Sequence, residues 1–405
     1  MSLLRGAFGQ QKRGPGDTQF ELVPSRIRNF GTGSVRVDGD SAMRHSAVWA
    51  CRTLRANLVS ATPLDVFRRV NGYQVEVPKP LVLRLPGGAR VGLPEWLYSS
   101  EMDLSGWGNV VGIITKRDGN GLPAEIELQA QEQVKVTGKG PHIEKFIISG
   151  KVYDKPEDIW HEKGPTVSGS PMGLSPIVYA AWSIGGYLSA QQYANDWFSM
   201  GPNPKGVLKH KEQDVLPDGV ADEVKGRFKA TTANGDIFVT GAAWEWTPET
   251  TTAQGAAFLD EMKYGAADVC RFFGVPADMI DAGTSGSAIT YSNVTQRNLQ
   301  FLIMNLGPSF ARREWAFSEY LLQQPRYVKF QTDALLRMDP ETRTKLLGQQ
   351  VKDRILTPTE AREVDNRLPY TEADYEQFER LFGRPGMKYT ITIPETETPI
   401  EGTPT

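Results

Sequence analysis

The stretch from Ile177 to Ser199 restricts the fold more than any other part of this sequence. Gly173-Leu174-Ser175-Pro176 precedes it, which is typical of a helix start, because serine caps the first turn and proline lacks an N–H that would need a partner there. At ~1.5 Å per residue the predicted helix is roughly 35 Å long. Large aromatic and small side chains alternate along it, which allows close helix contacts within one chain or between chains: Ala180, Ala181, Trp182, Gly185, Gly186, Tyr187, Ala190, Tyr193, Trp197 and Phe198.

Length and charge limit the class of protein. A chain of 405 residues, 40% of them hydrophobic, can bury a substantial core and should contain two or three structural units. The net charge of -3, from 45 basic and 48 acidic residues, excludes a protein that coats nucleic acid over its whole surface. Any contact with DNA must therefore be local or weak.

The cysteines and the N-terminus indicate where the protein is made. Cys51 and Cys270 are too few for a disulfide framework, and both lie in apolar stretches where a free thiol packs as a small hydrophobic group. We expect assembly in a reducing host cytoplasm. The N-terminus lacks the apolar core of a signal peptide, and no later run approaches the ~20 residues of a membrane span, which predicts a soluble, unexported protein.

The N-terminal half is predicted to form a flexible arm followed by an α+β unit. Residues 1–40 are polar and lack periodicity. Apolar residues at helical spacing predict a helix from Ala47 to Leu58, which Pro63 ends. Hairpin turns are expected at Asn71-Gly72 and at 118–121, because these residue types accept positive φ. Further predicted elements are a helix over 95–104, a turn over 106–109 and a strand over 110–114.

The C-terminal half alternates helices with a small insert. Within 202–255 we expect a strand (206–210), a helix (220–231) and two strands (237–240 and 243–247). A helix over 258–273 stops at Gly274 and Pro276, and a polar, Gly-rich loop follows. A long helix over 292–322 should kink at Gly307-Pro308. The last predicted elements are a strand over 327–331, helices over 340–353 and 357–365, the latter with a capping box, and a disordered tail over 391–405.

No constellation of residues predicts chemistry. The sequence has no Gly-x-x-x-x-Gly-Lys-Ser/Thr loop for nucleotides and no Gly-x-Ser-x-Gly or Ser-x-x-Lys for a nucleophile. Four histidines are scattered without metal-ligand spacing, and only His161 has an acidic neighbour, Glu162. We expect Asp218, Asp222 and Glu223 to lie on the solvent-exposed face of a helix. We therefore predict no catalytic residue, no cofactor, no metal and no enzymatic activity.

Several motifs, taken in the order in which they occur along the chain, resemble those of the portal proteins of tailed, siphophage-type bacteriophages. The resemblance runs from about Ser46 to Tyr375, and its most specific part is Val269-Cys-Arg-Phe-Phe-Gly-Val-Pro276. The loop over 281–288 and the closing tail depart from the family pattern. The other matching pieces are Ser46-Ala-Val-Trp-Ala-Cys51, Pro63-Leu64, Gly108-Asn109, Gly173-Leu-Ser-Pro176, Tyr291-Ser-Asn293, Leu306-Gly-Pro308, Phe330, Asp333, Leu335-Leu-Arg337 and Thr357-Pro-Thr-Glu-Ala-Arg362.

This resemblance implies a homo-oligomeric ring, usually a homododecamer, at one vertex of the virion capsid, with an axial channel for DNA packaging and ejection. The implied partners are double-stranded DNA in the channel, the terminase large subunit, head completion or adaptor proteins, and the major capsid or scaffold protein, with no membrane. The implied parts, in an α+β fold, are an arm (1–40), wing (41–174), stem helix (175–201), clip (202–255), second stem helix (256–274), tunnel loop (275–291), long kinked helix of the wing (292–330), helical crown (331–390) and tail (391–405).

Three groups of residues are the expected functional surfaces. The tunnel loop lacks lysine and arginine around Gly283 to Thr290, which suits brief contact with moving DNA; an ordinary exposed loop is the alternative. The clip surface could be merely solvated, and the aromatic residues could fill the core of one subunit. The groups are, for the tunnel loop, Asp281, Thr284, Ser285, Gly286, Ser287 and Thr290; for clip docking, Lys209, Lys211, Lys225, Arg227 and Lys229; and for the subunit interface, Trp182, Tyr187, Trp197 and Trp315.

Two other functions compete with this interpretation. A different head-tail adaptor ring would be a structural protein too, but such chains are usually much shorter and lack the order of helix, loop and kinked helix seen here. An unrecognised enzyme acting on nucleic acid would need acids or histidines clustered around a cleft, and the sequence displays no such cluster.

Overall fold

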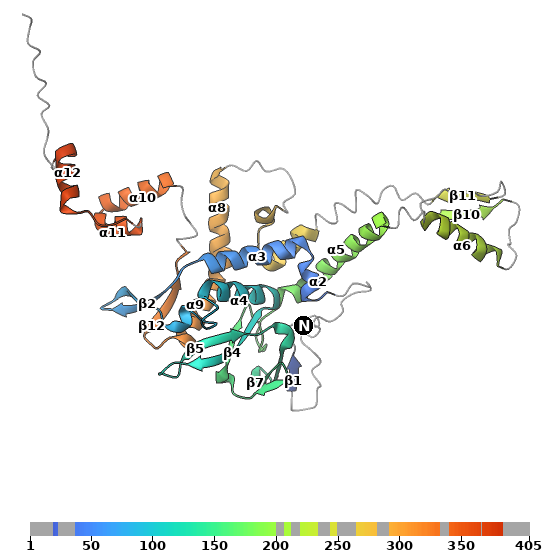
Figure 1. Cartoon of the computed structure of the whole chain (residues 1–405), viewed down its shortest axis with the longest axis horizontal. Helices are drawn as coiled ribbons and strands as arrows, with labels where there is room; N and C mark the ends of the chain where they lie inside the picture. The colour runs from blue at the N-terminus through green and yellow to red at the C-terminus, as the bar shows by residue number, and fades with distance from the viewer. Residues whose placement is uncertain are drawn as a thin grey trace, which may run out of the picture. The chain divides into compact units, whose positions relative to one another are not determined.

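The computed structural model describes residues 19–22, 37–199, 206–211, 219–233, 244–248, 265–281, 291–332, 340–365 and 367–383. The chain divides into two compact units, 1–335 and 336–405, which are taken separately below (Figure 1). The first unit combines helices with small antiparallel sheets, so the predicted α+β class is confirmed.

Two packed helices form the centre of the first unit. α3 (Ser46–Ala61) and α4 (Leu93–Trp107) lie side by side above strands β4 and β5 (Figure 1). α3 buries the predicted apolar positions Ala47, Val48 and Cys51 and ends before Pro63, as expected. α4 continues three residues beyond the predicted end and stops at Gly108, whose φ of 71° favours glycine. A short helix, α2 (Gly39–Met43), precedes them and starts with an Asp38–Ser41 capping box.

Three antiparallel sheets accompany these helices in the first unit. One has the order β12-β2-β3 (Arg326–Phe330, Leu64–Val70, Tyr73–Val77), and the predicted turn at Asn71-Gly72 joins β2 to β3 with φ of 50° and 85°. The second has the order β5-β4-β9 (Pro123–Leu128, Asn109–Arg117, Ile159–Lys163). The third has the order β1-β6-β7-β8 (Gln19–Leu22, Val134–Lys139, His142–Ile148, Lys151–Tyr153). Short 3-10 turns lie in the connections: η1 (Leu81–Leu83) between β3 and α4, η2 (Gln131–Gln133) before β6, and η3 (Pro156–Asp158) before β9.

Strand β1 differs from the expectation of a flexible arm. Residues 19–22 pair along β6, with Gln19 opposite Lys139 and Leu22 opposite Val136. Backbone hydrogen bonds to an open sheet edge order a strand without any periodic pattern of its own side chains, which is why the sequence did not indicate it.

One buried apolar cluster of the first unit lies between the second and third sheets. Its members are buried apolar residues of strands β4, β6, β7 and β9, with Met172 from the following loop: Val111, Val134, Val136, Phe146, Ile148, Ile159 and Met172. A second group of rings joins the sheets to the helices, since Trp96 of α4, Trp160 of β9 and Phe317 of α9 lie within 6.4 Å of one another.

The predicted long helix is present but changes its geometry. α8 (Tyr291–Phe301) and α9 (Gly307–Leu321) are joined by η5 (Leu302–Leu306), a π-helical turn. The Gly307 N–H donates to the carbonyl of Leu302, five residues earlier. Because Pro308 has no N–H, the regular hydrogen-bond pattern cannot continue there, and the π turn satisfies the backbone in its place.

The remaining helices of the first unit match the predicted order. α5 covers Pro176–Ser199, and residues 265–273 are helical up to Gly274, whose φ is 62°. The 3-10 turn η4 (Ala277–Ile280) follows. The predicted insert contains β10 (Gly206–His210) paired with β11 (Trp244–Pro248), and helix α6 (Val220–Ala233). The strand predicted over 237–240 lies outside the described residues.

The second unit contains three helices in the described range: α10 (Pro340–Lys352), α11 (Pro358–Val364) and α12 (Glu372–Phe382). The predicted Thr357–Glu360 capping box starts α11. A second capping box, formed by Thr371 and Asp374, starts α12, and neither this box nor this helix is predicted from the sequence. Arg343 pairs with Asp365 at 3.3 Å, and Arg362 lies 3.9 Å from the Tyr370 ring centre. The predicted disordered tail lies outside the described residues.

Candidate functional site

Two motifs that are distant in the sequence meet where α5 begins. The Asn109 side chain accepts a hydrogen bond from the Gly173 N–H (2.8 Å) and donates one to the Gly173 carbonyl (3.1 Å). Ser175 donates to the Gly106 carbonyl (2.8 Å) and also caps α5 by accepting from the Val178 N–H. A Cβ at Gly108 would lie 2.0 Å from the Leu174 carbonyl oxygen. The direction in which α5 leaves the α+β body is thus set by these backbone contacts.

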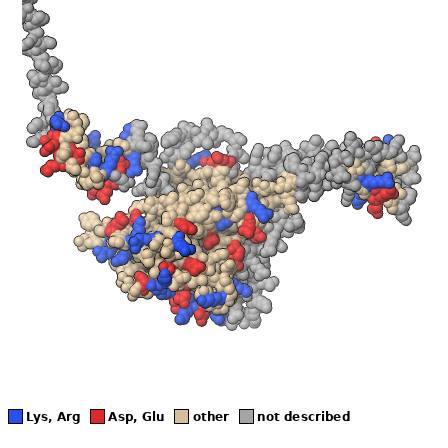
Figure 2. All heavy atoms as spheres, viewed as in Figure 1, with Lys and Arg blue, Asp and Glu red and all other residues tan. Residues whose placement is uncertain are grey.

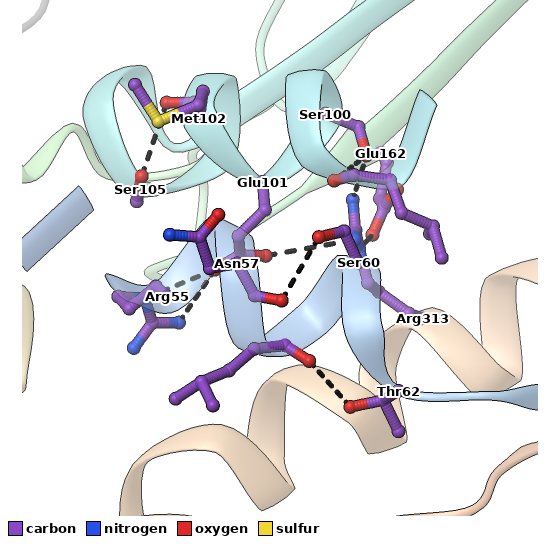
Figure 3. Close-up of polar contacts among 12 residues, drawn as sticks. Arg55, Asn57, Ser60, Thr62, Ser100, Glu101, Met102, Ser105, Glu162 and Arg313 are labelled. Carbon is purple, nitrogen blue, oxygen red and sulfur yellow. Dashed lines mark hydrogen bonds and ion pairs between the residues drawn. The ribbon is translucent and has the colours of Figure 1, made fainter. Parts of the chain in front are cut away.

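A buried group of charges connects four elements of the body (Figure 3). Arg313 of α9 donates to Glu162 of β9 (2.7 Å) and to Ser100 of α4 (2.5 Å), and its guanidinium lies 3.8 Å from Glu101. Arg55 of α3 pairs with the other oxygen of Glu101 at 3.0 Å. The Arg313 and Glu101 side chains are each 1% exposed. Burial raises the pKa of Glu162, while the positive charge of Arg313 opposes that rise.

His161 and Glu162, the one histidine and acid that are adjacent in the sequence, contact different partners. His161 lies 3.2 Å from the Asn109 amide oxygen, whereas Glu162 faces Arg313, because successive residues of a strand point to opposite faces. Burial lowers the pKa of His161 to about 3, so its imidazole is neutral at physiological pH. In the described part of the chain no three potential metal ligands come together, and no helix there is long and apolar enough to cross a membrane.

The two predicted stem helices touch each other directly. Ser183 of α5 donates to Asp268 of the helical segment 265–273 (2.8 Å), and Asp268 also pairs with Arg271 at 3.2 Å. Arg55 of α3 reaches the carbonyl of Phe273 at the end of that segment (3.4 Å). These contacts hold the end of the second helix against both α5 and the body.

The base of the predicted tunnel loop is closed by an ion pair. Asp278 of η4 pairs with Arg297 of α8, so the chain is held together on both sides of residues 282–290. Asp281, the one predicted tunnel residue within the described part of the chain, is exposed and has a φ of 54°. The other predicted tunnel residues, Thr284, Ser285, Gly286, Ser287 and Thr290, lie outside the described residues.

The predicted interface aromatics differ in their surroundings. Trp182 of α5 is 71% exposed and Trp315 of α9 is 62% exposed, so neither is in the core of one subunit. Tyr187 stacks on His45 within the chain, with ring centres 3.9 Å apart. Trp197 lies in α5 at a position whose side chain is outside the described ones. Trp49 of α3 (56% exposed) and Tyr179 of α5 (39% exposed) were not predicted, and helical periodicity alone could not have separated them from core positions.

The predicted clip residues lie on the small αβ insert. Lys209 and Lys211 are exposed on or beside β10, and Lys225 is exposed on α6. Arg227 pairs with Glu223 one turn earlier (2.7 Å), while the side chain of Lys229 is outside the described ones. Figure 2 shows basic and acidic side chains interspersed on α6 and over the body, which agrees with the nearly balanced charge of the chain.

Comparison with known proteins gives consistent matches. Residues 46–366 match the sequence model of the family described as phage portal protein. The portal protein of Enterobacteria phage HK97 is 26% identical over 357 residues, covering 84% of this chain and 83% of that protein. A probable portal protein of Streptomyces phage phiC31 is 23% identical over 389 residues, with 86% and 81% covered.

Solved structures share the fold. The crystal structure of an HK97 family phage portal protein from Corynebacterium diphtheriae aligns with a TM-score of 0.58 and 18% identity, over 76% of this chain and all of that one. A chain from the virion of a native gene transfer agent particle aligns with a TM-score of 0.53 and 20% identity, over 82% of this chain and 94% of that one.

Proposed function

This chain belongs to the phage portal protein family and is a structural protein of the virion, and we propose that identical copies of it close into a ring whose channel carries double-stranded DNA during packaging and ejection. The observation that carries the proposal is the family match over residues 46–366, which includes the α+β body, both predicted stem helices and the long helix. The neck of a related gene transfer agent particle was computed with C12 symmetry, which supports a ring of about a dozen subunits.

We assign the stem to α5 and the segment 265–273. The hydrogen bond between Ser183 and Asp268 couples the two helices, and the Asn109 junction fixes the start of α5 on the body. Asn109 is 1% exposed, so the hydrogen bonds of its side chain to the Gly173 backbone are shielded from water and hold the start of α5 firmly on the body.

We assign residues 275–291 to the channel as a tunnel loop. The Asp278–Arg297 pair joins η4 to α8 and so holds the two described ends of this loop together. Around Gly283 to Thr290 the sequence offers small and polar residues without lysine or arginine. Each lysine bound to a phosphate would add about one unit to the salt dependence of binding, so this composition favours brief contacts with sliding DNA.

We assign Trp182 and Trp315 to the contacts between neighbouring subunits. Each leaves most of a large aromatic ring in water in the single chain, and tryptophan is the residue type that most often dominates interface energy. The clip is assigned to docking of the terminase large subunit and of head completion or adaptor proteins, and the α+β wing to contact with major capsid or scaffold protein. The family match over most of the chain favours this function over a shorter head-tail adaptor.

Electron microscopy combined with mass measurement on the purified full-length protein tests the ring. We expect closed rings of about a dozen copies with a central hole. Trp182→Ser and Trp315→Ser should shift the protein towards monomers with unchanged circular dichroism. Tyr73→Ser, which changes an aromatic residue of a hairpin strand that is 77% exposed, serves as the control and should leave rings intact. Wild-type protein that stays monomeric in the presence of terminase and capsid proteins would refute the proposal.

A further inference from the structure

The two cysteines of the chain lie against each other in the folded protein. Cys51 of α3 and Cys270 of the segment 265–273 are 219 positions apart in sequence, yet their Sγ atoms are 3.9 Å apart. Their exposed fractions are 0% and 1%, and both are free thiols. The two sulfur atoms therefore face each other across the junction between α3 and the second stem helix. The proposed ring and DNA channel give this pair of thiols no role.

The surroundings make the two thiols unequal. The Cys51 thiol donates to Cys270, which lowers the pKa of Cys270 and raises that of Cys51. The positive charge of the neighbouring Arg271 also favours the Cys270 thiolate. Arg55, one turn after Cys51, binds the Phe273 carbonyl and holds the two helices at this point. Because the thiolate is the nucleophile, these contacts favour Cys270 as the attacking sulfur, although its burial opposes ionisation.

A small oxidant would reach the buried Cys270 through a local opening of its helix. Arg271 and Phe272, the next two residues in the segment 265–273, are both exposed, and Phe272 is 40% exposed. A local opening of one helical turn would uncover the sulfur without global unfolding. Hydrogen peroxide is about as large as two water molecules and can enter through such an opening, whereas a bulky thiol reagent cannot.

We propose that Cys51 and Cys270 are an oxidation site that forms an intrachain disulfide when the protein meets peroxide outside the reducing cell. The Cys270 thiolate attacks one peroxide oxygen, so an S–O bond forms, the O–O bond breaks and hydroxide leaves, taking up a proton to become water. The sulfur of Cys51 then attacks the sulfenic acid, the S–S bond forms, and the S–O bond breaks with release of a second water. Two thiols lose two electrons, and one peroxide is reduced to two water molecules.

The disulfide would act as a covalent lock on the second stem helix. The sulfur atoms need to approach from 3.9 Å to about 2 Å, a movement that side-chain rotation and a small helix shift can supply. The lock would tie the end of the segment 265–273, and through it η4 and the tunnel-loop base, to α3. Reduced protein inside the cell would keep these parts free to adjust, and oxidised protein in the released particle would not. This inference is independent of the proposed ring.

The test uses full-length protein that is purified in the presence of a reductant. The reductant is then removed, and the protein is exposed to hydrogen peroxide. After catalase treatment the protein is denatured, alkylated and measured by mass spectrometry. We expect loss of both alkylatable thiols, an intact mass about 2 Da lower, and one peptide pair joining Cys51 to Cys270 that dithiothreitol separates. The melting temperature should rise after oxidation and return to its starting value after reduction.

Two variants identify the order of events. Cys51→Ala leaves Cys270 without a partner, so Cys270 should gain oxygen and its mass should increase instead of falling. Cys270→Ala should leave the Cys51 thiol alkylatable after the same treatment. Wild-type protein that keeps both thiols, that accumulates oxygen on Cys270, or that forms disulfides between chains would overturn the proposal. The wild-type measurement stands by itself if a variant does not fold, and ring formation is scored separately.

Discussion

Asp103 of α4 is a carboxyl group whose environment makes the stability of the fold depend on pH. Burial raises its pKa to about 7 from an ordinary value of 3.8, and the nearby charge of Arg52 only partly opposes this rise. The folded state therefore holds the proton more tightly than the unfolded state. The stabilisation is complete below about pH 4 and is lost as the pH rises through about 7.

Asp103→Asn tests this prediction. The amide cannot ionise, so its free energy of unfolding should lack this contribution to the pH dependence. At pH 4 the variant should resemble the wild type, and at pH 8 it should be more stable than the wild type by up to about 4 kcal/mol. Chemical denaturation followed at several pH values measures the difference. A difference that does not change between pH 4 and pH 8 would show that Asp103 ionises normally.

Arg313 is the second residue whose burial has a measurable consequence. It compensates Glu162 directly and lies near Glu101, and all three side chains are at most 3% exposed. Removing one partner of a buried ion pair leaves an uncompensated charge, so Arg313→Met should lower the free energy of unfolding by about 3–5 kcal/mol. Arg326→Met, at an exposed position of β12, makes the same change away from these carboxylates; it is the control and should cost far less.

A second substitution separates charge from packing. Glu101 keeps its pair with Arg55 in the Arg313→Met variant, whereas Glu162 loses its partner. Glu162→Gln added to Arg313→Met removes this uncompensated carboxylate, so it should recover part of the lost stability. No recovery in the double variant would mean that the loss comes from the missing side-chain volume and not from the charge.

At the scale of elements, the base of the tunnel loop offers a prediction about motion. The Asp278–Arg297 pair is partly exposed, with 35% and 49% of the side chains accessible, so it should add less than about 1 kcal/mol to global stability. Its expected effect is local. Asp278→Ala or Arg297→Ala should speed amide hydrogen exchange in η4 and the first turns of α8 without lowering the melting temperature, and should slow DNA packaging in vitro.

A charge swap provides the control for that experiment. Asp278→Arg combined with Arg297→Asp rebuilds the pair in the opposite direction and should restore slow exchange and normal packaging. If each single variant exchanges as slowly as the wild type, the pair does not hold the base of the loop.

The elements that the sequence predicted best are those with strong local signals. Pro63, Gly274 and the Thr357–Glu360 capping box each end or start a helix where expected. The sequence did not predict β1, because edge pairing depends on β6, which is more than a hundred residues away. It also treated Gly108-Asn109 and Gly173-Leu174-Ser175-Pro176 as separate motifs, although the structure joins them through Asn109. Contacts between distant segments leave no periodic pattern in the chain.

At the scale of the whole molecule, charge balance decides what kind of docking surface the clip can provide. A chain with a net charge of -3 cannot attract an acidic partner through its overall field, so attraction must come from local basic residues. Lys209, Lys211 and Lys225 are exposed on the clip. Arg227 differs from them, because reversing its charge would also break its pair with Glu223 and disturb α6 itself.

The clip prediction therefore rests on the lysines. Lys209→Glu combined with Lys225→Glu should weaken binding of the terminase large subunit at least tenfold at low salt, since opposite charges steer and hold such encounters. The loss should shrink as salt rises, because surface charges are screened within about 10 Å at 0.1 M salt. Surface plasmon resonance on assembled rings measures both effects, and Lys151→Glu on β8 of the wing is the matched control. Unchanged terminase affinity in the double variant would leave the clip as a solvated surface and would direct the search for the docking site to another part of the ring.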